Sequence, residues 1–103
     1  MRILFLDNAV ERHLDHQKII DRFNKHEFSL KADCTTDELL SSKYNIIIVH
    51  KGNTKEYNCT LVNQLGKHRI FFSGAERNPR KTEKGIFAST DTIEDELSEL
   101  LEE

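Results

Sequence analysis

The chain has 103 residues, of which 37% are hydrophobic and 32% are charged, and its formal net charge is −3. This length and composition are typical of a globular chain with one core, so we expect a single domain over residues 1–103. The negative net charge argues against a nucleic-acid-binding protein, because such proteins depend on clustered Lys and Arg to contact phosphates.

Nothing in the sequence predicts a membrane or secreted protein. No apolar run approaches the ~20 residues of a membrane span, and the apolar start of the chain is short and interrupted by an acid, unlike a secretory signal. Cys34 and Cys59 lack the CxxC spacing of metal and redox motifs. We therefore expect a cytoplasmic protein whose thiols stay reduced.

Five short runs of apolar, β-branched or aromatic residues predict strands. The first, at residues 2–7, is nearly all apolar, whereas the second, at 27–33, alternates with polar residues as an edge strand does. The third, NIIIV at 45–49, is the most apolar run and is the predicted central strand. The last two are RIFFS at 69–73 and GIFAS at 85–89.

Helical patterns follow most of these strands. Asn8 and Glu11 fit a capping box that opens the first helix. The apolar stripe of this helix is predicted to be Val10, Leu14, Ile19, Ile20 and Phe23. Further caps predict helices at residues 36–44 and 55–65 and an acidic last helix from Asp91. The core stripe of the last helix is predicted to be Ile93, Leu97, Leu100 and Leu101.

The segment between the last two strands interrupts the alternation. GAERNPRKTEK, at residues 74–84, has no large apolar residue, and Pro79 would interrupt a helix, so we expect a solvated loop. The alternation elsewhere predicts a three-layer α/β sandwich with a five-stranded parallel sheet in the order 2-1-3-4-5, in which a loop replaces the fourth helix. Predicted core residues are Ile3, Phe5, Leu14, Ile20, Ile46, Ile48, Leu61, Leu65, Ile70, Phe72, Phe87 and Leu97.

The opening RILFLDNAVERH resembles the start of response-regulator receiver domains. It is most similar to a phage and bacterial branch described as cyclic-phosphate-processing receivers. The resemblance implies a CheY-like, flavodoxin-like fold over nearly the whole chain. It also implies four functional positions: acids after the first strand that hold Mg²⁺, a phosphoacceptor Asp after the third, a Ser or Thr after the fourth and a Lys after the fifth. Each missing carboxylate weakens such a magnesium site.

These positions carry over only in part. Asp7 matches one acid of the cluster, and Asn8 replaces its neighbour. His50 stands at the phosphoacceptor position, Ser73 matches the hydroxyl position, and the lysine position after GIFAS is lost. We therefore predict that the domain is not phosphorylated on aspartate.

The leading functional hypothesis is a pseudo-receiver, a regulatory module without catalysis that binds a protein. With a loop in place of the fourth helix, we expect exposed aromatic residues on the last two strands, and apolar patches usually mark partner surfaces. In receivers this side is the signalling and dimer face. The basic loop is expected to meet an acidic protein, such as the last helix of a second copy in a homodimer. A subunit of a larger assembly fits the same features. The predicted interaction residues are Phe71, Arg77, Arg80, Lys81, Lys84, Phe87, Glu94 and Leu101.

Two alternatives place chemistry at the strand ends. A small phosphate-ester-binding protein or hydrolase of the cyclic-phosphate branch would use Asp7, His50 and Ser73, since acid–base catalysis needs a His held by a carboxylate. His50 would also serve as a phosphohistidine if Asp7 oriented it. His13 and His16 lie one helical turn apart and with Asp7 form a candidate metal site, although two histidines alone do not complete a zinc site.

No cofactor motif is present. KGNTK, at residues 51–55, has one glycine before a predicted helix but lacks the spacing of a nucleotide-binding P-loop. The segment after the first strand is not the Ser/Thr/Gly-rich loop that flavin phosphate requires. We therefore expect a domain without a cofactor.

Overall fold

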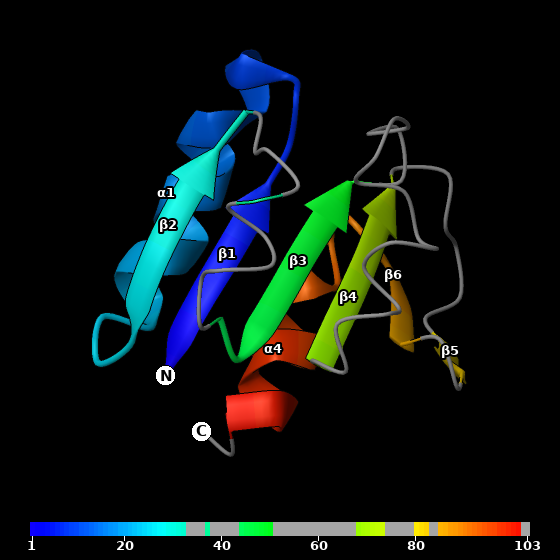
Figure 1. The fold of residues 1–103 in the computed structure, drawn as a ribbon. Helices are drawn as coiled ribbons and strands as arrows, with labels where there is room; N and C mark the ends of the chain where they lie inside the picture. Colours follow the sequence, from blue (N-terminus) through cyan, green and yellow to red (C-terminus); the bar gives the residue numbers. More distant parts are fainter. Residues whose placement is uncertain (33–36, 38–43, 51–67, 74–79, 83–84, 102–103) are drawn as a thin grey trace.

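The computed structural model describes residues 1–32, 37, 44–50, 68–73, 80–82 and 85–101. Within these ranges the chain forms a six-stranded sheet with the order β2-β1-β3-β4-β6-β5 (Figure 1). The strands are β1 (Arg2–Leu6), β2 (Glu27–Lys31), β3 (Ile46–His50), β4 (His68–Ser73), β5 (Arg80–Thr82) and β6 (Gly85–Ser89). The described helices are a 3₁₀ turn η1 (Val10–Arg12), α1 (His13–Arg22) and α4 (Ile93–Leu101).

The five predicted strands are confirmed, parallel and in the predicted order, with β6 as the fifth. The helices predicted at residues 36–44 and 55–65 lie almost entirely outside the described residues. No helix in the described part of the chain is long and apolar enough to cross a membrane.

A sixth strand corrects the prediction of a loop at residues 74–84. Residues 80–82 form β5, which pairs antiparallel with β6, while residues 74–79 and 83–84 lie outside the described ranges. Pairing in a sheet depends on backbone hydrogen bonds, so polar residues satisfy the free edge of β6 without burying apolar side chains. Gly85 begins β6 with φ 134°, where a Cβ atom would lie 2.8 Å from the carbonyl oxygen of Arg69, so this position requires glycine.

The strands alternate between two buried clusters, one on each face of the sheet. The first cluster packs against α1 and α4, which both lie behind the sheet in Figure 1. Its strand residues are Ile3, Phe5, Ile46, Ile48, Ile70, Phe72, Ile86 and Ala88. The opposite cluster consists of Leu4, Leu6, Tyr44, Ile47, Val49 and Phe71, with Phe87 packed against it. Burial on both faces explains why the central strands are nearly continuous apolar runs.

The first helix buries only the second half of its predicted stripe, because Ile19, Ile20 and Phe23 face the core whereas Val10 and Leu14 do not. The predicted core residue Leu14 is 78% exposed and Val10 is 63% exposed, whereas His16 is 1% exposed. Because successive helical residues are ~100° apart, Leu14 and His16 point to nearly opposite sides. The predicted Asn8 cap is also wrong, because η1 begins after Ala9 without a side-chain cap.

The remaining predicted core residues agree with the structure where it describes them. Leu97 and the predicted residues of β1, β3 and β4 are buried, and Ile20 and Phe87 are partly buried. Leu61 and Leu65 lie outside the described residues.

Candidate functional site

Asp7 directly follows β1 at the edge where the parallel strands have their carboxyl ends. Its side chain is fully buried, and its amide donates to the carbonyl oxygen of Lys31, which continues the pairing of β1 with β2. The register pairs Leu6 with Val49, so His50 on β3 is the next residue level with Asp7. The structure therefore brings two predicted site residues to the same edge.

Three neighbours satisfy the Asp7 carboxylate. Arg12 donates from Nε to Oδ2 at 2.7 Å and from Nη2 to Oδ1 at 2.8 Å, which is a two-point contact between guanidinium and carboxylate. The amide of Ala9 donates to Oδ1 at 3.0 Å, and Nε2 of His16 lies 2.8 Å from Oδ2. Each carboxylate oxygen thus has two hydrogen-bond partners, and Arg12 and Asp7 form a part-buried ion pair.

These contacts decide the charge of Asp7. Burial by itself would raise the pKa of the carboxyl group, but the hydrogen bonds from Arg12, His16 and the Ala9 amide outweigh it and hold the pKa well below its ordinary value. Asp7 is therefore ionised at neutral pH, and Nε2 of His16 must carry the proton that it donates. His13 also turns toward this residue, with Nε2 donating to the main-chain oxygen of Asp7 at 2.7 Å.

His16 forms the inner wall of the cluster. Its ring stacks on Phe5 with 4.2 Å between centroids and meets Phe72 edge-on at 5.4 Å. The sequence marked this residue only as a possible metal ligand. His16 lies seven residues before the buried Phe23, which is the spacing of residues on one face of a helix. This spacing indicates a buried His16 if histidine is considered as a core residue.

His50 is half-buried at the end of β3 and meets Phe72 edge-on at 5.1 Å. Its pKa lies below the ordinary value, first because burial disfavours the charged ring; Arg12 and His16 lower it further, and Asp7 partly opposes them. The Asp7 carboxylate hydrogen-bonds Arg12 and His16, so it orients the ring of His16. These bonds do not support the prediction that Asp7 orients His50.

Ser73 ends β4 and lies level with Ser89 at the end of β6. It is partly buried on the same carboxyl edge as His50, whose register partner on β4 is Phe72. The three residues of the hydrolase hypothesis thus share one edge of the sheet.

The metal-site prediction is not supported within the described ranges. Asp7, His13 and His16 do come together, but both histidines use Nε2 for hydrogen bonds to Asp7. No group of three His, Cys, Asp or Glu among the described residues could hold a metal ion. Arg12 supplies the positive charge on the carboxylate that, in the receiver resemblance, would bind magnesium.

Two predicted apolar interaction residues are buried, so this part of the prediction is wrong. Phe71 is fully buried and Leu101 is 9% exposed, because both belong to the core clusters. Phe87 is half-buried, with its ring 5.1 Å from that of Phe71, and Arg80 lies over its outer face at 4.7 Å. The β5 strand and the second cluster cover these rings.

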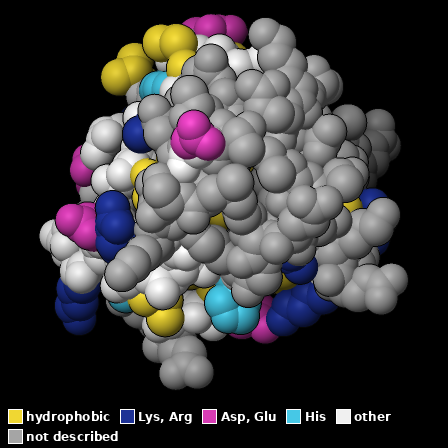
Figure 2. Space-filling model, in the orientation of Figure 1, with side chains coloured by type: hydrophobic (Ala, Val, Ile, Leu, Met, Phe, Trp, Pro, Cys, Tyr) yellow, Lys and Arg dark blue, Asp and Glu magenta, His cyan; other side chains and the backbone are white. Residues whose placement is uncertain are grey.

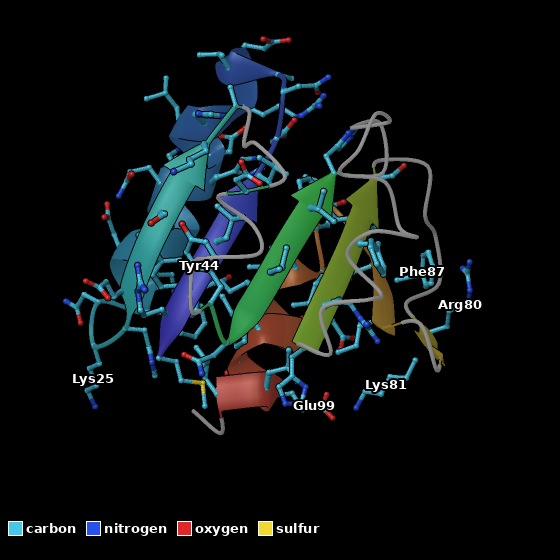
Figure 3. The ribbon with its side chains drawn as sticks, in the orientation of Figure 1. Lys25, Tyr44, Arg80, Lys81, Phe87 and Glu99 are labelled. Atoms are coloured by element: carbon cyan, nitrogen blue, oxygen red, sulfur yellow. The ribbon has the colours of Figure 1, made fainter. Side chains whose placement is uncertain are left out.

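The predicted charged residues pair within the chain. Lys81 hydrogen-bonds Glu99, so β5 contacts the acidic last helix of its own chain (Figure 3). Glu94 binds Arg22 at 2.9 Å and joins α4 to α1. Opposite charges therefore do meet, but inside one molecule. Arg77 and Lys84 lie outside the described residues.

Comparison with solved structures finds response regulators with a similar fold. No family model matches the chain, and no curated protein does. A two-component response regulator from Clostridium difficile is 11% identical, with a TM-score of 0.66 over 99% of this chain and 96% of its own. The chain has a receiver-like fold. The Vibrio cholerae chemotaxis protein CheY4 is 13% identical, with a TM-score of 0.63 over 98% of this chain and 95% of its own. A response regulator receiver protein from Pseudoalteromonas atlantica is 12% identical, with a TM-score of 0.65 over 99% and 94%.

Proposed function

We propose that this receiver-like domain is a cytoplasmic pseudo-receiver, which binds a protein partner and is not phosphorylated on aspartate. The observation that carries the proposal is the two-point contact of Arg12 with Asp7. Magnesium requires carboxylate oxygens with free lone pairs. At Asp7 these oxygens are occupied by Arg12, His16 and the amide of Ala9.

The fixed guanidinium has a second consequence. A metal ion would have to displace Arg12 from a buried partner, and breaking such a pair leaves an uncompensated charge in the interior. His50 at the phosphoacceptor position offers no carboxylate to complete a metal site. A domain of this kind has no switch driven by magnesium and phosphoryl groups, so its partner surface is available constitutively.

We assign the partner surface to β5, the outer side of β6 and α4. Arg80, Lys81 and Glu99 are exposed there; Arg80 lies over the half-buried Phe87, and Lys81 and Glu99 lie on the opposite face of the sheet. On the face of the molecule that Figure 2 shows, which is opposite α4, the described acidic and basic side chains are mixed and hydrophobic atoms appear in separate spots. The exposed charges of Arg80, Lys81 and Glu99 suit a non-obligate contact with another protein, including a second copy of this chain.

A second candidate is a phosphate-ester-binding or hydrolytic site formed by Asp7, His50 and Ser73. The observation that favours it is the lowered pKa of His50, which keeps the imidazole neutral at pH 7 and able to accept a proton. Because the carboxylate of Asp7 is already satisfied by Arg12 and His16, this candidate ranks second.

Titration of the isotope-labelled protein with Mg²⁺ and beryllofluoride tests the first proposal. We expect no chemical-shift change at Asp7 or His50 in the wild-type protein. Purification from native cells should recover one protein partner, and Arg80→Glu should abolish that recovery. A stable beryllofluoride adduct would contradict the pseudo-receiver, and hydrolysis of a cyclic phosphate ester that depends on His50 would establish the second candidate.

A further inference from the structure

A pocket of about 360 Å³ lies between α4 and the sheet. It is at the amino ends of the parallel strands, whereas Asp7 is at their carboxyl ends. His68 and Ile86 come from the starts of β4 and β6, whereas Asp7 follows the end of a parallel strand. The residues that line the pocket are His68, Lys81, Ile86, Glu96, Glu99 and Leu100. This volume is within the range of pockets that hold small ligands, so it can take one side chain from another molecule.

The alternation of β5 determines which of its charges reaches the pocket. The register pairs Lys81 with Ile86 and Arg80 with Phe87. Directly opposite residues share a face of the sheet, and Ile86 belongs to the cluster that packs against α4. Lys81 therefore extends toward α4 and binds Glu99, while Arg80 lies over Phe87 on the other face.

The α4 helix supplies the acidic and apolar sides of the pocket. Glu96, Glu99 and Leu100 are three and four residues apart, so they lie on one side of the helix. Because Lys81 hydrogen-bonds Glu99, their opposite charges balance. Lys81 also attracts Glu96 electrostatically, so one positive charge faces two acids and one negative charge is left over.

One carboxylate oxygen of Glu96 lacks a hydrogen-bond donor. Its Oε2 atom is buried and has no hydrogen-bond partner in the structure. Arg69 does not serve this purpose, because it alternates with Ile70 and shares the opposite face of the sheet with Phe71. A buried oxygen that has lost its contact with water and has no donor is unfavourable, and a donor group that enters the pocket would supply the missing hydrogen bond.

We propose that the pocket holds a lysine or arginine side chain of the protein partner. The aliphatic part of such a side chain would lie on Ile86 and Leu100, and its charged head would donate to Glu96. Charge complementarity favours this occupant, because the α4 sequence IEDELSELL contains four acids and no basic residue. The inference rests on the proposed function and names the chemistry by which the partner is anchored.

Two blocked tripeptides provide the probe. One has the sequence alanine–arginine–alanine, and the other replaces arginine with citrulline, which has nearly the same shape and no charge. Titrated into the labelled full chain, the arginine peptide should shift the amide signals of His68, Ile86 and Leu100, and the citrulline peptide should not. Equal shifts with both peptides, or shifts with neither, would overturn the inference.

Three variants locate the binding. Glu96→Gln should weaken the arginine peptide about tenfold, the usual size of a lost hydrogen bond to a charged group. Asp95→Asn removes the same charge from the same helix outside this pocket and should leave the affinity within about twofold. Lys81→Met should strengthen binding, because it removes a like charge and releases Glu99. An equal loss in Glu96→Gln and Asp95→Asn would reduce the effect to general attraction and contradict the pocket.

The proposed function has a separate outcome. If the native partner is retained by Glu96→Gln and lost by Arg80→Glu, the pocket is excluded and the pseudo-receiver stands. If both variants retain the partner, the assigned surface is wrong as well.

Discussion

The two ends of the parallel strands, here called the carboxyl edge and the amino edge of the sheet, differ in how their charged side chains are paired. At the carboxyl edge, Asp7 is fully buried and each of its oxygens has two hydrogen-bond partners. At the amino edge, the pair formed by Lys81 and Glu99 is exposed, and Glu96 has a buried oxygen without a partner. A site whose charges are completely paired has little to gain from an ion or a phosphoryl group. A site with an oxygen that lacks a donor gains from a ligand that supplies one. The difference therefore favours ligand binding at the amino edge over the carboxyl edge, where the receiver resemblance implies phosphorylation.

Breaking the Arg12–Asp7 pair should have the largest effect. Arg12→Met keeps the aliphatic stem but leaves Asp7 buried without its main counter-charge. Loss of one partner from a buried pair costs about 3–5 kcal/mol, and because the Arg12 side chain is 36% exposed we expect about 3 kcal/mol from urea denaturation. Arg12→Lys should fall between wild type and Arg12→Met, because lysine keeps the charge and loses the two-point geometry.

The matched control is Arg2, which pairs with Glu27 at 3.2 Å on the surface. The side chains of Arg2 and Glu27 are 47% and 74% exposed, so Arg2→Met should cost less than about 1 kcal/mol. Similar losses in Arg12→Met and Arg2→Met would mean that the Asp7 cluster is no more closed than an ordinary surface pair.

The pH dependence of stability should report the same cluster. Asp7 has a lower pKa in the folded protein than in the unfolded chain, so its contribution is complete above the ordinary value of 3.8 and is lost as pH falls below it. Between pH 5 and pH 3 the wild-type protein should therefore lose more stability than Asp7→Asn, by about 1 kcal/mol. Parallel pH profiles for the two proteins, measured by urea denaturation, would contradict this assignment.

Sequence reasoning recovered the sheet because its signal is local. Runs such as IIIV, the first four residues of β3 (Ile46–His50), are apolar on both faces, which is the pattern of a strand buried on both sides. β5 carries no such signal, because Arg80–Thr82 joins the sheet through backbone bonds to the free edge of β6. Hydrophobicity scales do not register pairing of this kind.

The candidate site was harder to predict for a different reason. The sequence placed Asp7 and His50 at one edge correctly, since parallel strands end together. It did not reveal that Arg12 and His16 fold back on Asp7, because the 3₁₀ turn at Val10–Arg12 shifts the phase of the helix that follows. Sequence reasoning also assigned Lys81 to a contact between molecules. In the structure Lys81 instead bonds Glu99, eighteen residues later in the same chain.

The titration of His50 sharpens the comparison on a smaller scale. Its NMR titration should give a pKa below 6.5, because burial disfavours the charged ring. Asp7→Asn should lower this pKa further, since Asp7 favours the imidazolium, and Arg12→Met should raise it. A pKa that does not respond to either substitution would show that His50 is electrostatically separate from the cluster.

The exposed pair at the amino edge should show the smallest effect on stability. Lys81 and Glu99 are each 61% exposed, so water solvates both charges almost as well when they are apart. Lys81→Met and Glu99→Gln should therefore leave the midpoint of urea denaturation unchanged within error, in contrast to Arg12→Met. Because the fold persists, any change in peptide affinity in these variants arises from the pocket itself. A clear loss of stability in both variants would show that the pair fastens β5 to α4, and the amino edge would then be a structural contact as closed as the one at Asp7.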